Sequence, residues 1–402
     1  MTTATAPQPA VLRPPRASAH RPPGLRVAGL FAGIGGIELG LHRAGHQSVL
    51  LCEIEPGAQG VLRARFPDIE LTGDVCGLES LPDVDLVAAG FPCQDLSQAG
   101  RTLGIEGSQS GLVGQVFRLL KKAHPRWLLL ENVPFMLQLD RGRAMRHVTN
   151  ELGDLGFRWA YRVVDARSFG MPQRRQRVLL LASRDQDPRP VLFADDPGEP
   201  PERDPSGLAC GFYWTEGIRG LGWAIDAVPT LKGGSTIGIP SPPAVWMPGG
   251  LVGTPDVRDA ERLQGFPADW TAVDGPAIRR RTGARWKMVG NAVCIPVAQW
   301  VGERLTNPGT VDDTVSRPFT GGRWPMAAWG EGRHAYTFNV SLWPLSAPRP
   351  HLADFLDHPV RPLSIRATQG FLARTDRSSL RFPCGFLDAV RLHLKAMERA
   401  AA

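Results

Sequence analysis

Cys93 is the residue of this sequence best placed to act as a nucleophile. It lies in Gly90–Gln94 (GFPCQ), directly after the apolar run Val84–Ala89, and a long stretch rich in Gly, Ser and Gln follows at Asp95–Gly111. Reactive groups in doubly wound sheets lie at the carboxyl ends of strands, and long loops without structure are usually functional. We therefore expect Cys93 to attack an electrophile beneath a mobile loop. The other cysteines have the apolar surroundings of core residues.

An acidic residue follows the next apolar run. Glu131 comes directly after Trp127–Leu130, a strand expected to end at the same sheet edge as the strand before Cys93. A carboxyl group at that edge could donate a proton to a substrate. Taken alone, it could equally be a helix cap or an ion-pair partner.

Three polar residues alternate before a further apolar run. Gln173, Arg175 and Arg177 share one face if they lie on a single strand with Val178–Ala182, because the side chains of a strand alternate. Two guanidinium groups on one face suit the polar edge of a base or a phosphate. A solvated run of charges would show the same pattern.

A glycine turn and two downstream acids indicate a nucleotide-like ligand. The turn at 31–36 (FAGIGG) separates an apolar run from a helical stretch, and its glycines would let a ligand approach the backbone closely. Glu53 ends the second apolar run and could accept both hydroxyls of a ribose. Asp74 follows a third probable strand and could meet an adenine amino group. NAD would suit this arrangement too, although the spacing is not G-x-G-x-x-G.

These groups depend on elements that alternate along the chain. The expected strands are Arg26–Phe31, Ser48–Cys52, Val84–Ala89, Trp127–Leu130, Arg158–Asp165 and Gln176–Ala182. The expected helices are Ile37–Ala44, Pro56–Phe66, Leu112–Ala123 and one near Arg143–Leu155, with further regular stretches at Pro255–Leu263, Val293–Leu305 and Phe386–Met397. The alternation predicts an α/β fold with a doubly wound, mostly parallel sheet.

Composition divides the chain into segments. Residues 1–24 are rich in Pro, Ala and Arg without an apolar period, and we expect a disordered tail. Residues 25–184 form the predicted catalytic domain, which resumes at 256–306. Between them, residues 185–255 are dense in Pro and Gly and predict a smaller, irregular domain with short strands. Residues 307–402 form a C-terminal extension to which the sequence assigns no role.

The charge of the chain favours a polyanionic partner, though weakly. The formal net charge is +7 and the pI about 9.4. Residues 1–26 hold four arginines and no acid, and residues 361–402 hold eight Lys or Arg against three acids. Such basic ends could bind nucleic acid or be solvated tails.

Some classes of protein do not suit this sequence. No C-x-x-C pair or Cys/His cluster has zinc spacing, which argues against a metal. No apolar run approaches the roughly 20 residues that span a bilayer, and the N-terminus has no apolar core of a secretory signal. A disulfide framework does not suit 6 cysteines in 402 residues. We expect a cytoplasmic protein without membrane contact.

Six short motifs occur in the order of one enzyme family. They are F-x-G-x-G-G at 31–36, P-C-Q at 92–94, E-N-V at 131–133, Q-x-R-x-R at 173–177, R-L-Q-G-F-P at 262–267 and G-N-A-V at 290–293. Over residues 25–306 they resemble the successive motifs of the DNA cytosine-5 methyltransferases. The resemblance implies a methyltransferase version of the doubly wound sheet, in which the last helix, Val293–Leu305, folds back beside the first motif.

The resemblance also implies S-adenosylmethionine as the methyl donor. Ile54 would pack on the adenine, and the backbone of Gly33 and Gly35 would border the pocket. The other pocket residues that it implies are Phe31, Glu53, Asp74, Pro92, Asn291 and Ala292.

The chemistry implied by the family is attack of the Cys93 thiolate on C6 of a cytosine, with Glu131 at N3. C5 would then take the methyl group, and loss of the C5 proton and of Cys93 would restore the ring. Arg177 would hold the cytosine O2, and Asn132 would position Glu131 and the Pro92 backbone. Because a stacked base cannot be reached, the target base must flip out of the duplex.

A target-recognition domain is implied between the Q-x-R-x-R motif and Arg262. Thr230 and Leu231 resemble the one short signature found inside such domains, and with Arg175 they are the expected DNA contacts. Gln173 and Arg175 would also support the catalytic edge.

Three other interpretations stay open. They are a tRNA cytosine-5 methyltransferase with the same chemistry, a non-catalytic DNA-binding relative, and a nicotinamide oxidoreductase, which would need no Cys93. The sequence holds no regulatory or chromatin-reading module. It therefore fits a monomeric bacterial enzyme of restriction-modification or phage defence, which acts on double-stranded DNA alongside a cognate restriction or defence system.

Overall fold

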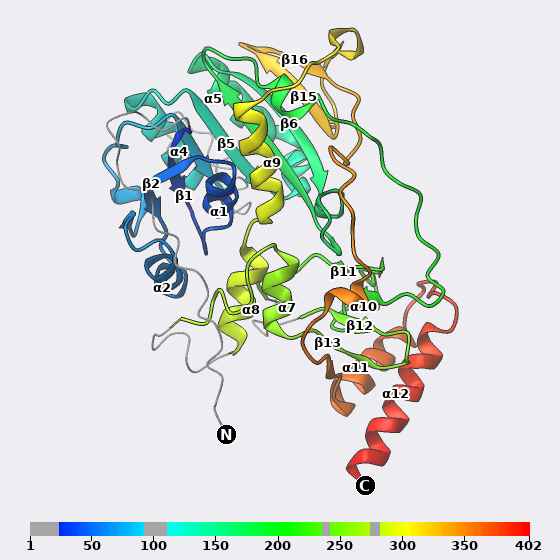
Figure 1. The fold of residues 1–402 in the computed structure, drawn as a ribbon. Helices are drawn as coiled ribbons and strands as arrows, with labels where there is room; N and C mark the ends of the chain where they lie inside the picture. The colour runs from blue at the N-terminus through cyan, green and yellow to red at the C-terminus, as the bar shows by residue number, and fades with distance from the viewer. Residues whose placement is uncertain (1–23, 92–110, 235–241, 274–281) are drawn as a thin grey trace. The chain divides into compact units, whose positions relative to one another are not determined.

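The computed structural model describes residues 24–91, 111–234, 242–273 and 282–402, which form two compact units (Figure 1). The first unit consists of the residues up to Ser168 with Gln176–Glu199 and Ala292–Ser346. The second consists of Phe169–Arg175, Pro200–Asn291 and Ala347–Ala402. The predicted disordered tail, except its last residue, and the stretch that contains Pro92 and Cys93 lie outside the described residues.

A ten-stranded sheet with the order β14-β16-β15-β6-β8-β5-β4-β1-β2-β3 forms the frame of the first unit. Its strands are β1 (Arg26–Leu30), β2 (Gln47–Cys52), β3 (Glu70–Thr72), β4 (Leu86–Ala89), β5 (Trp127–Asn132), β6 (Arg158–Asp165), β8 (Gln176–Ser183), β14 (Arg317–Pro318), β15 (Ala327–Glu331) and β16 (His334–Thr337). Each neighbouring pair in β5-β4-β1-β2-β3 is parallel, whereas β8 runs antiparallel to both β5 and β6. This mixed, mostly parallel sheet confirms the predicted α/β class.

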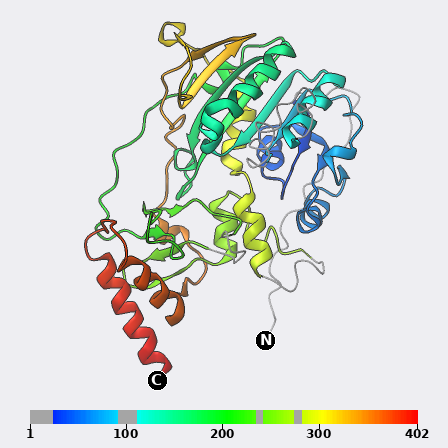
Figure 2. The same cartoon turned by 180° about the vertical axis from the view of Figure 1, so that it is seen from behind.

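Helices cover both faces of this sheet. Figures 1 and 2 show α1 and α9 on one face and α4 and α5 on the other. The helices are α1 (Gly36–Arg43), α2 (Pro56–Arg65), α4 (Leu112–Lys122), α5 (Arg143–Asp154), α6 (Arg189–Leu192) and α9 (Ile295–Thr306). Short 3-10 helices lie at Val75–Gly77, Pro134–Leu137, Leu139–Gly142, Ala166–Phe169 and Asp313–Val315. Apolar side chains of α4 and α5, such as Val116 and Val148, pack with strand residues such as Leu128 in one buried core.

Two glycines let α9 lie directly against α1. A Cβ built at Gly40 would lie 2.6 Å from the Cβ of Ala298, and one at Gly302 would lie 2.6 Å from the Cβ of Ala44. Both separations are far below van der Waals contact, so only glycine allows this approach. The helix predicted at Val293–Leu305 is thus present as α9 and folds back beside the first motif.

Three strands that the sequence pattern did not predict extend the sheet. β15 pairs antiparallel with β6, and β16 and β14 follow outward. The ring of Trp324, just before β15, packs edge-on against Trp159 and Tyr161 of β6, with centroids 6.1 and 6.2 Å apart. The segment after residue 306 is therefore divided, with residues up to Ser346 in the first unit and the rest in the second.

The second unit is built on a five-stranded antiparallel sheet with the order β10-β9-β12-β13-β17. Its strands are β9 (Cys210–Phe212), β10 (Ala224–Ile225), β12 (Ala244–Trp246), β13 (Val252–Thr254) and β17 (Arg361–Pro362), and β7 (Gln173–Arg174) pairs separately with β11 (Val228–Pro229). Its helices are α7 (Val257–Leu263), α8 (Thr282–Asn291), α10 (Leu352–Phe355), α11 (Ile365–Thr375) and α12 (Phe386–Ala401). Residues 347–402, called the C-terminal segment below, thus supply a strand and three helices to this unit.

An aromatic core joins that C-terminal segment to the sheet. Phe371 of α11 and Phe386 of α12 are fully buried against Phe212 of β9, with ring centroids 5.2 and 4.8 Å from it. No helix within the described ranges is both long and apolar enough to cross a membrane.

The prediction of one strand that carries Gln173, Arg175 and Arg177 is wrong. Gln173–Arg174 form β7 of the second unit, while β8 begins at Gln176 in the first. The two residues of β7 pair with β11 instead of continuing into β8. The Val228 N–H donates to the Pro172 carbonyl (2.9 Å) and holds β7 beside β11.

Candidate functional site

A strained turn follows β1 in the first unit. Phe31 has φ of 56°, and Gly33 and Gly35 have φ of 56° and 84°. Such values suit glycine but are rare for a phenylalanine, and strain of this kind gathers at functional sites. The Gly33 N–H donates to Glu53 Oε2 (2.7 Å), and the Glu55 N–H donates to Glu53 Oε1 (2.8 Å). The acid predicted for the ribose therefore also fixes the glycine turn.

The ends of β2 and β3 present the other groups predicted for a nucleotide. Ile54, next to Glu53, is 65% exposed, which is unusual for a large apolar side chain. Asp74 follows β3, is exposed, and accepts a hydrogen bond from the Cys76 N–H (2.9 Å). An apolar surface flanked by carboxylates at neighbouring strand ends suits an adenosine group.

Glu38 is a second acid close to this turn, and the sequence interpretation assigned it no role. It lies in the first turn of α1 and is 1% exposed, and within the described part of the chain its carboxylate meets no hydrogen-bonding group of another residue. Burial raises the pKa of Glu38 to about 7, and the negative charge of Glu53 adds to this rise. The signal in the sequence was an acid among the apolar residues of a short helix.

A second group of candidate residues lies at the end of β5, whose last two residues are Glu131 and Asn132. β4 and β5 pair in parallel with Ala89 opposite Leu130, so the chain leaving β4 runs beside these two residues. Asn132 Nδ2 donates to the Phe91 carbonyl (3.0 Å), and its Oδ1 accepts from the Val133 N–H (2.8 Å). The backbone that leads into Pro92 and Cys93 is therefore fixed, although those two residues lie outside the described ranges.

Glu131 also meets the arginine predicted to act with it. Arg177 Nε lies 2.9 Å from Glu131 Oε1, and both side chains are largely buried. Arg177 Nη1 donates to the Gln176 carbonyl (2.7 Å), which further fixes the guanidinium. A carboxyl group held beside a fixed cation at a strand end can bind a polar heterocycle through hydrogen bonds.

In the second unit, Gln173 and Arg175 are buried and bind backbone groups. Gln173 Nε2 donates to the Leu263 carbonyl (2.8 Å), and its Oε1 accepts from the Leu231 N–H (3.0 Å). Arg175 donates to the carbonyls of Leu231 (3.1 Å) and Gly290 (3.4 Å). These two side chains hold the 230–231 segment and the ends of α7 and α8 together.

Thr230 and Leu231 differ in what they present. Leu231 is 1% exposed, so its side chain belongs to the core. Thr230 is half-buried, and its hydroxyl donates to the Arg174 carbonyl (2.8 Å) while its own carbonyl accepts from Tyr213 Oη (2.7 Å). Asn291 ends α8 and is exposed, and a Cβ built at Gly233 would lie 2.2 Å from its Oδ1.

Ala292 belongs to the first unit and is buried. Beyond it, the Val293 carbonyl oxygen would lie 2.4 Å from a Cβ built at Gly36. Gly36 must therefore be glycine for this segment to reach the first turn of α1. Within the described residues, no group of three or more His, Cys, Asp or Glu side chains could hold a metal ion.

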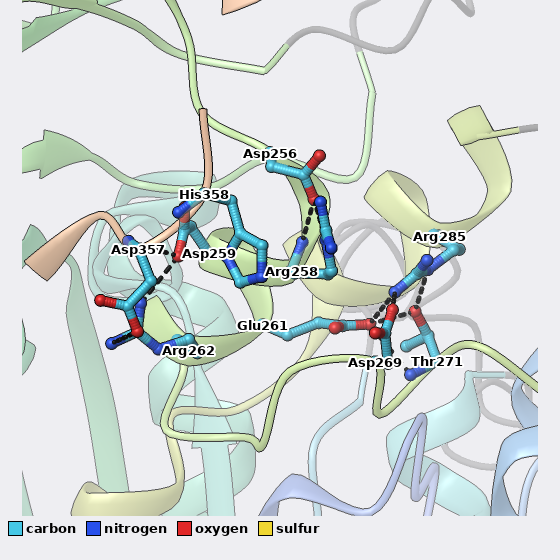
Figure 3. Close-up of polar contacts among 10 residues, drawn as sticks. All are labelled: Asp256, Arg258, Asp259, Glu261, Arg262, Asp269, Thr271, Arg285, Asp357 and His358. Atoms are coloured by element: carbon cyan, nitrogen blue, oxygen red, sulfur yellow. Dashed lines mark hydrogen bonds and ion pairs between the residues drawn. The ribbon is translucent and has the colours of Figure 1, made fainter. Parts of the chain in front are cut away.

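Arg262 of the R-L-Q-G-F-P motif anchors the C-terminal segment, a function not predicted from the sequence. It donates to Asp259 Oδ1 (2.8 Å) and to the Phe355 carbonyl (2.7 Å) and pairs with Asp357 (2.8 Å). Asp259 accepts from the His358 N–H (3.0 Å). Figure 3 shows this cluster beside a second one, in which Arg285 binds Glu261, Asp269 and Thr271.

The chain is similar to known methyltransferases over most of its length. The family described as C-5 cytosine-specific DNA methylase matches residues 25–203. The Type II methyltransferase M2.BsuMI of Bacillus subtilis (strain 168) is 52% identical over 367 residues, which cover 88% of this chain and 94% of the relative. The Type II methyltransferase M.NgoBI of Neisseria gonorrhoeae is 31% identical over 291 residues, 67% of this chain and 89% of the relative.

A solved structure has a similar fold. The S. pombe Dnmt2 methyltransferase matches with a TM-score of 0.52 and 17% identity, over 70% of this chain and 97% of that one.

Proposed function

The chain belongs to the C-5 cytosine-specific DNA methylases and is a DNA (cytosine-5-)-methyltransferase, and on this premise we propose how its residues perform the reaction. The proposed reaction transfers a methyl group from S-adenosylmethionine to C5 of a cytosine flipped out of a specific double-stranded sequence, through a covalent Cys93 adduct. The observation that carries it is the Glu131–Arg177 pair (2.9 Å) at the end of β5, beside the chain that leads from β4 to Cys93.

The proposed cofactor pocket lies at the ends of β1, β2 and β3. The turn at Phe31, Gly33 and Gly35, the carboxylate of Glu53, the exposed side chain of Ile54 and Asp74 suit the adenosine part of S-adenosylmethionine. Pro92, Asn291 and Ala292 complete the proposed set. When bound, S-adenosylmethionine supplies an electrophilic methyl group on its sulfonium.

The remaining chemistry belongs to this chain's residues. The Cys93 thiolate forms a bond to C6 while Glu131 hydrogen-bonds or protonates N3, and electron density moves to C5. C5 becomes enamine-like and would take up the methyl group while the methyl–sulfur bond breaks and its electron pair stays on the sulfur of the departing thioether. Loss of the C5 proton to water and elimination of the Cys93 thiolate then restore the aromatic ring. Arg177 binds the cytosine O2 and holds Glu131 in place.

Other residues act by positioning. Asn132 holds the backbone before Pro92 through the Phe91 carbonyl (3.0 Å). Gln173 and Arg175 keep the 230–231 backbone in place, so that Thr230 contacts DNA while Leu231 and Arg175 act from the core. Apart from Asn291, which belongs to the second unit, we assign cofactor and base chemistry to the first unit, and we assign target recognition to the second.

Methyl transfer from labelled donor tests the proposal. Wild-type protein should label duplex DNA and not tRNA, and Cys93→Ala should label neither while still binding S-adenosylmethionine. A duplex with 5-fluorocytosine at the target should trap the wild-type protein covalently, because fluorine cannot leave C5 as a proton does. Labelling of tRNA alone would favour the tRNA enzyme, and full activity of Cys93→Ala would exclude the covalent route.

The similarity to Type II methyltransferases supports a proposal for the biological setting. We propose a monomeric enzyme of restriction-modification or phage defence that protects DNA from a cognate nuclease. Bisulfite sequencing of DNA from expressing cells would reveal the methylated sequence, and a cognate nuclease should then fail to cut that DNA.

A further inference from the structure

A short hairpin, residues 213–221, connects β9 to β10 in the second unit. Its backbone is ordered by the Tyr213 N–H, which donates to the Leu221 carbonyl (2.9 Å), and by the Gly217 N–H, which donates to the Gly220 carbonyl (2.9 Å). Ile218 and Arg219 form its tip. The major groove of duplex DNA admits an element as wide as a two-stranded ribbon or a helix, and a tight turn at the end of two paired strands is no wider than that.

The C-terminal segment fixes this hairpin. Arg374 of α11 donates to the carbonyls of Trp214 (2.7 Å) and Glu216 (3.0 Å), and Ser378 Oγ donates to the Ile218 carbonyl (3.1 Å). Gly217 adopts φ of +115° and packs against Phe371, 3.2 Å from a built Cβ. Three backbone carbonyls of the hairpin, all within one stretch of five residues, are therefore bound by side chains of a segment that begins more than 100 residues later in the sequence.

The base of the hairpin contacts the segment that carries Thr230. Tyr213 Oη donates to the Thr230 carbonyl (2.7 Å). Lys232 Nζ lies 2.6 Å from Glu216 Oε1 and 3.6 Å from the centre of the Tyr213 ring. These contacts fix the position of the hairpin relative to Thr230, the proposed DNA contact.

The tip presents two exposed side chains. Ile218 is 42% exposed, and Arg219 is exposed and makes no hydrogen bond or ion pair within the described part of the chain. Because the backbone of the tip is already fixed, binding costs little further ordering of the backbone, and the planar guanidinium of an arginine can donate two parallel hydrogen bonds. Guanine offers the matching pair of acceptors, O6 and N7, in the major groove, and an apolar neighbour suits a thymine methyl group.

We propose that Arg219 is a specificity-determining residue that reads a guanine in the target sequence, and that Arg374 is the positioning residue that holds the hairpin for it. This proposal rests on the proposed action on duplex DNA. It gives the C-terminal segment a function in target recognition, because the segment orients a base-reading arginine through backbone contacts.

The test compares Arg219→Ala, Arg219→Lys and Arg374→Ala with the matched control Arg366→Ala. Arg366 is an exposed arginine on α11 without a hydrogen bond or ion pair in the described residues, so its removal changes the net charge equally. Each full-length variant methylates a library of duplexes, and sequencing after bisulfite treatment gives the preference at every base. Thermal denaturation and S-adenosylmethionine binding show whether each variant is folded.

Arg219→Ala should lower kcat/KM on the wild-type target by about 5- to 150-fold, the range for loss of one bidentate base contact, and relax the preference at one guanine position. Arg219→Lys should retain part of the rate but not the preference. Arg374→Ala should relax the same position, and its combination with Arg219→Ala should add little. Arg366→Ala should stay within roughly twofold of wild type.

A uniform loss of activity on all sequences for Arg219→Ala, matched by Arg366→Ala and with a reduced salt dependence, would mark a phosphate contact and overturn the proposal. Unchanged preference would also overturn it. If Arg374→Ala does not fold, Ser378→Ala removes one anchoring bond and should relax the same position more mildly. Failure of wild-type protein to methylate any duplex would instead refute the proposed function.

Discussion

Arg177 Nε lies 2.9 Å from Oε1 of Glu131, and this contact joins the start of β8 to the end of β5. The other carboxylate oxygen of Glu131 faces Gly90, 3.6 Å from a Cβ built there. Asn132, the neighbour of Glu131, instead binds the Phe91 carbonyl. The orientation of Glu131 therefore depends on Arg177, while Asn132 fixes the approach to Cys93.

Arg177→Ala should lower kcat for duplex methylation by roughly 10²- to 10⁴-fold, as expected when a group that orients a proton donor is lost. Binding of S-adenosylmethionine should not change, because Arg177 lies outside the proposed cofactor pocket. Glu131→Gln should lower kcat by a similar factor. Steady-state methylation with saturating donor measures kcat, and calorimetric titration measures donor binding.

The matched control for Arg177→Ala is Arg158→Ala. Arg158 pairs with Glu331 on the same sheet at 2.9 Å, but both side chains are about half exposed. An exposed pair contributes at most about 1 kcal/mol, so Arg158→Ala should retain near-normal kcat. Equal losses in the two variants would show that Arg177 acts only on stability.

Glu38→Gln should change how stability depends on pH. Below pH 4.5 the carboxyl is protonated in both states. Between pH 4.5 and about 7 the unfolded chain ionises Glu38 while the folded chain keeps its proton, so the free energy of unfolding falls as pH rises. Because the carboxyl is buried, this loss should reach about 3 kcal/mol before levelling off above pH 7.

Urea denaturation of wild type and Glu38→Gln from pH 4.5 to 8 measures this difference. The glutamine keeps the shape of the side chain without its titration, so the variant should gain stability relative to wild type as pH rises to 7. A constant difference across this range would show that Glu38 ionises at its ordinary pKa.

Gly40→Ala should destabilise the first unit by about 1–3 kcal/mol, because the new methyl group meets Ala298 of α9 at 2.6 Å. Gly77→Ala is the control, since a Cβ there meets nothing within 4 Å. Denaturant unfolding gives both values. Similar stability of the two variants would mean that α1 and α9 can move apart without lowering the free energy of unfolding.

The periodic parts of the fold were predictable from sequence. β1, β2, β4, β5 and the helices beside them follow apolar runs and helical spacing, and these elements lie within one or two residues of the predicted bounds. The strands β14 to β16 were not predicted, because β14 is only two residues long and β15 gains its stability from pairing with β6 and from the Trp324 contacts rather than from its own pattern.

The residues of the candidate site also include some that the sequence indicated and some that it did not. Glu53 and Glu131 were found by their places at strand ends, which a sequence reveals directly. The buried positions of Gln173 and Arg175 could not be deduced, because alternation predicted one shared face on a single strand, whereas their partners are backbone groups up to 115 residues away. Glu38 was missed because its only signal is a single acid among the apolar residues of a short helix, and a single acid has no spacing pattern.

Phe371→Ala should destabilise the second unit by about 3–5 kcal/mol, the loss typical of removing a fully buried aromatic ring. Phe371 packs on Phe212 and Phe386, so this change breaks the core that joins the C-terminal helices to the sheet. Leu392→Ala on α12 is the control, because Leu392 is 65% exposed and should matter by less than about 0.5 kcal/mol. Limited proteolysis should cut Phe371→Ala faster within residues 200–234, whereas Leu392→Ala should resist like wild type. Equal resistance of the two variants would show that the sheet of this unit does not depend on the C-terminal helices.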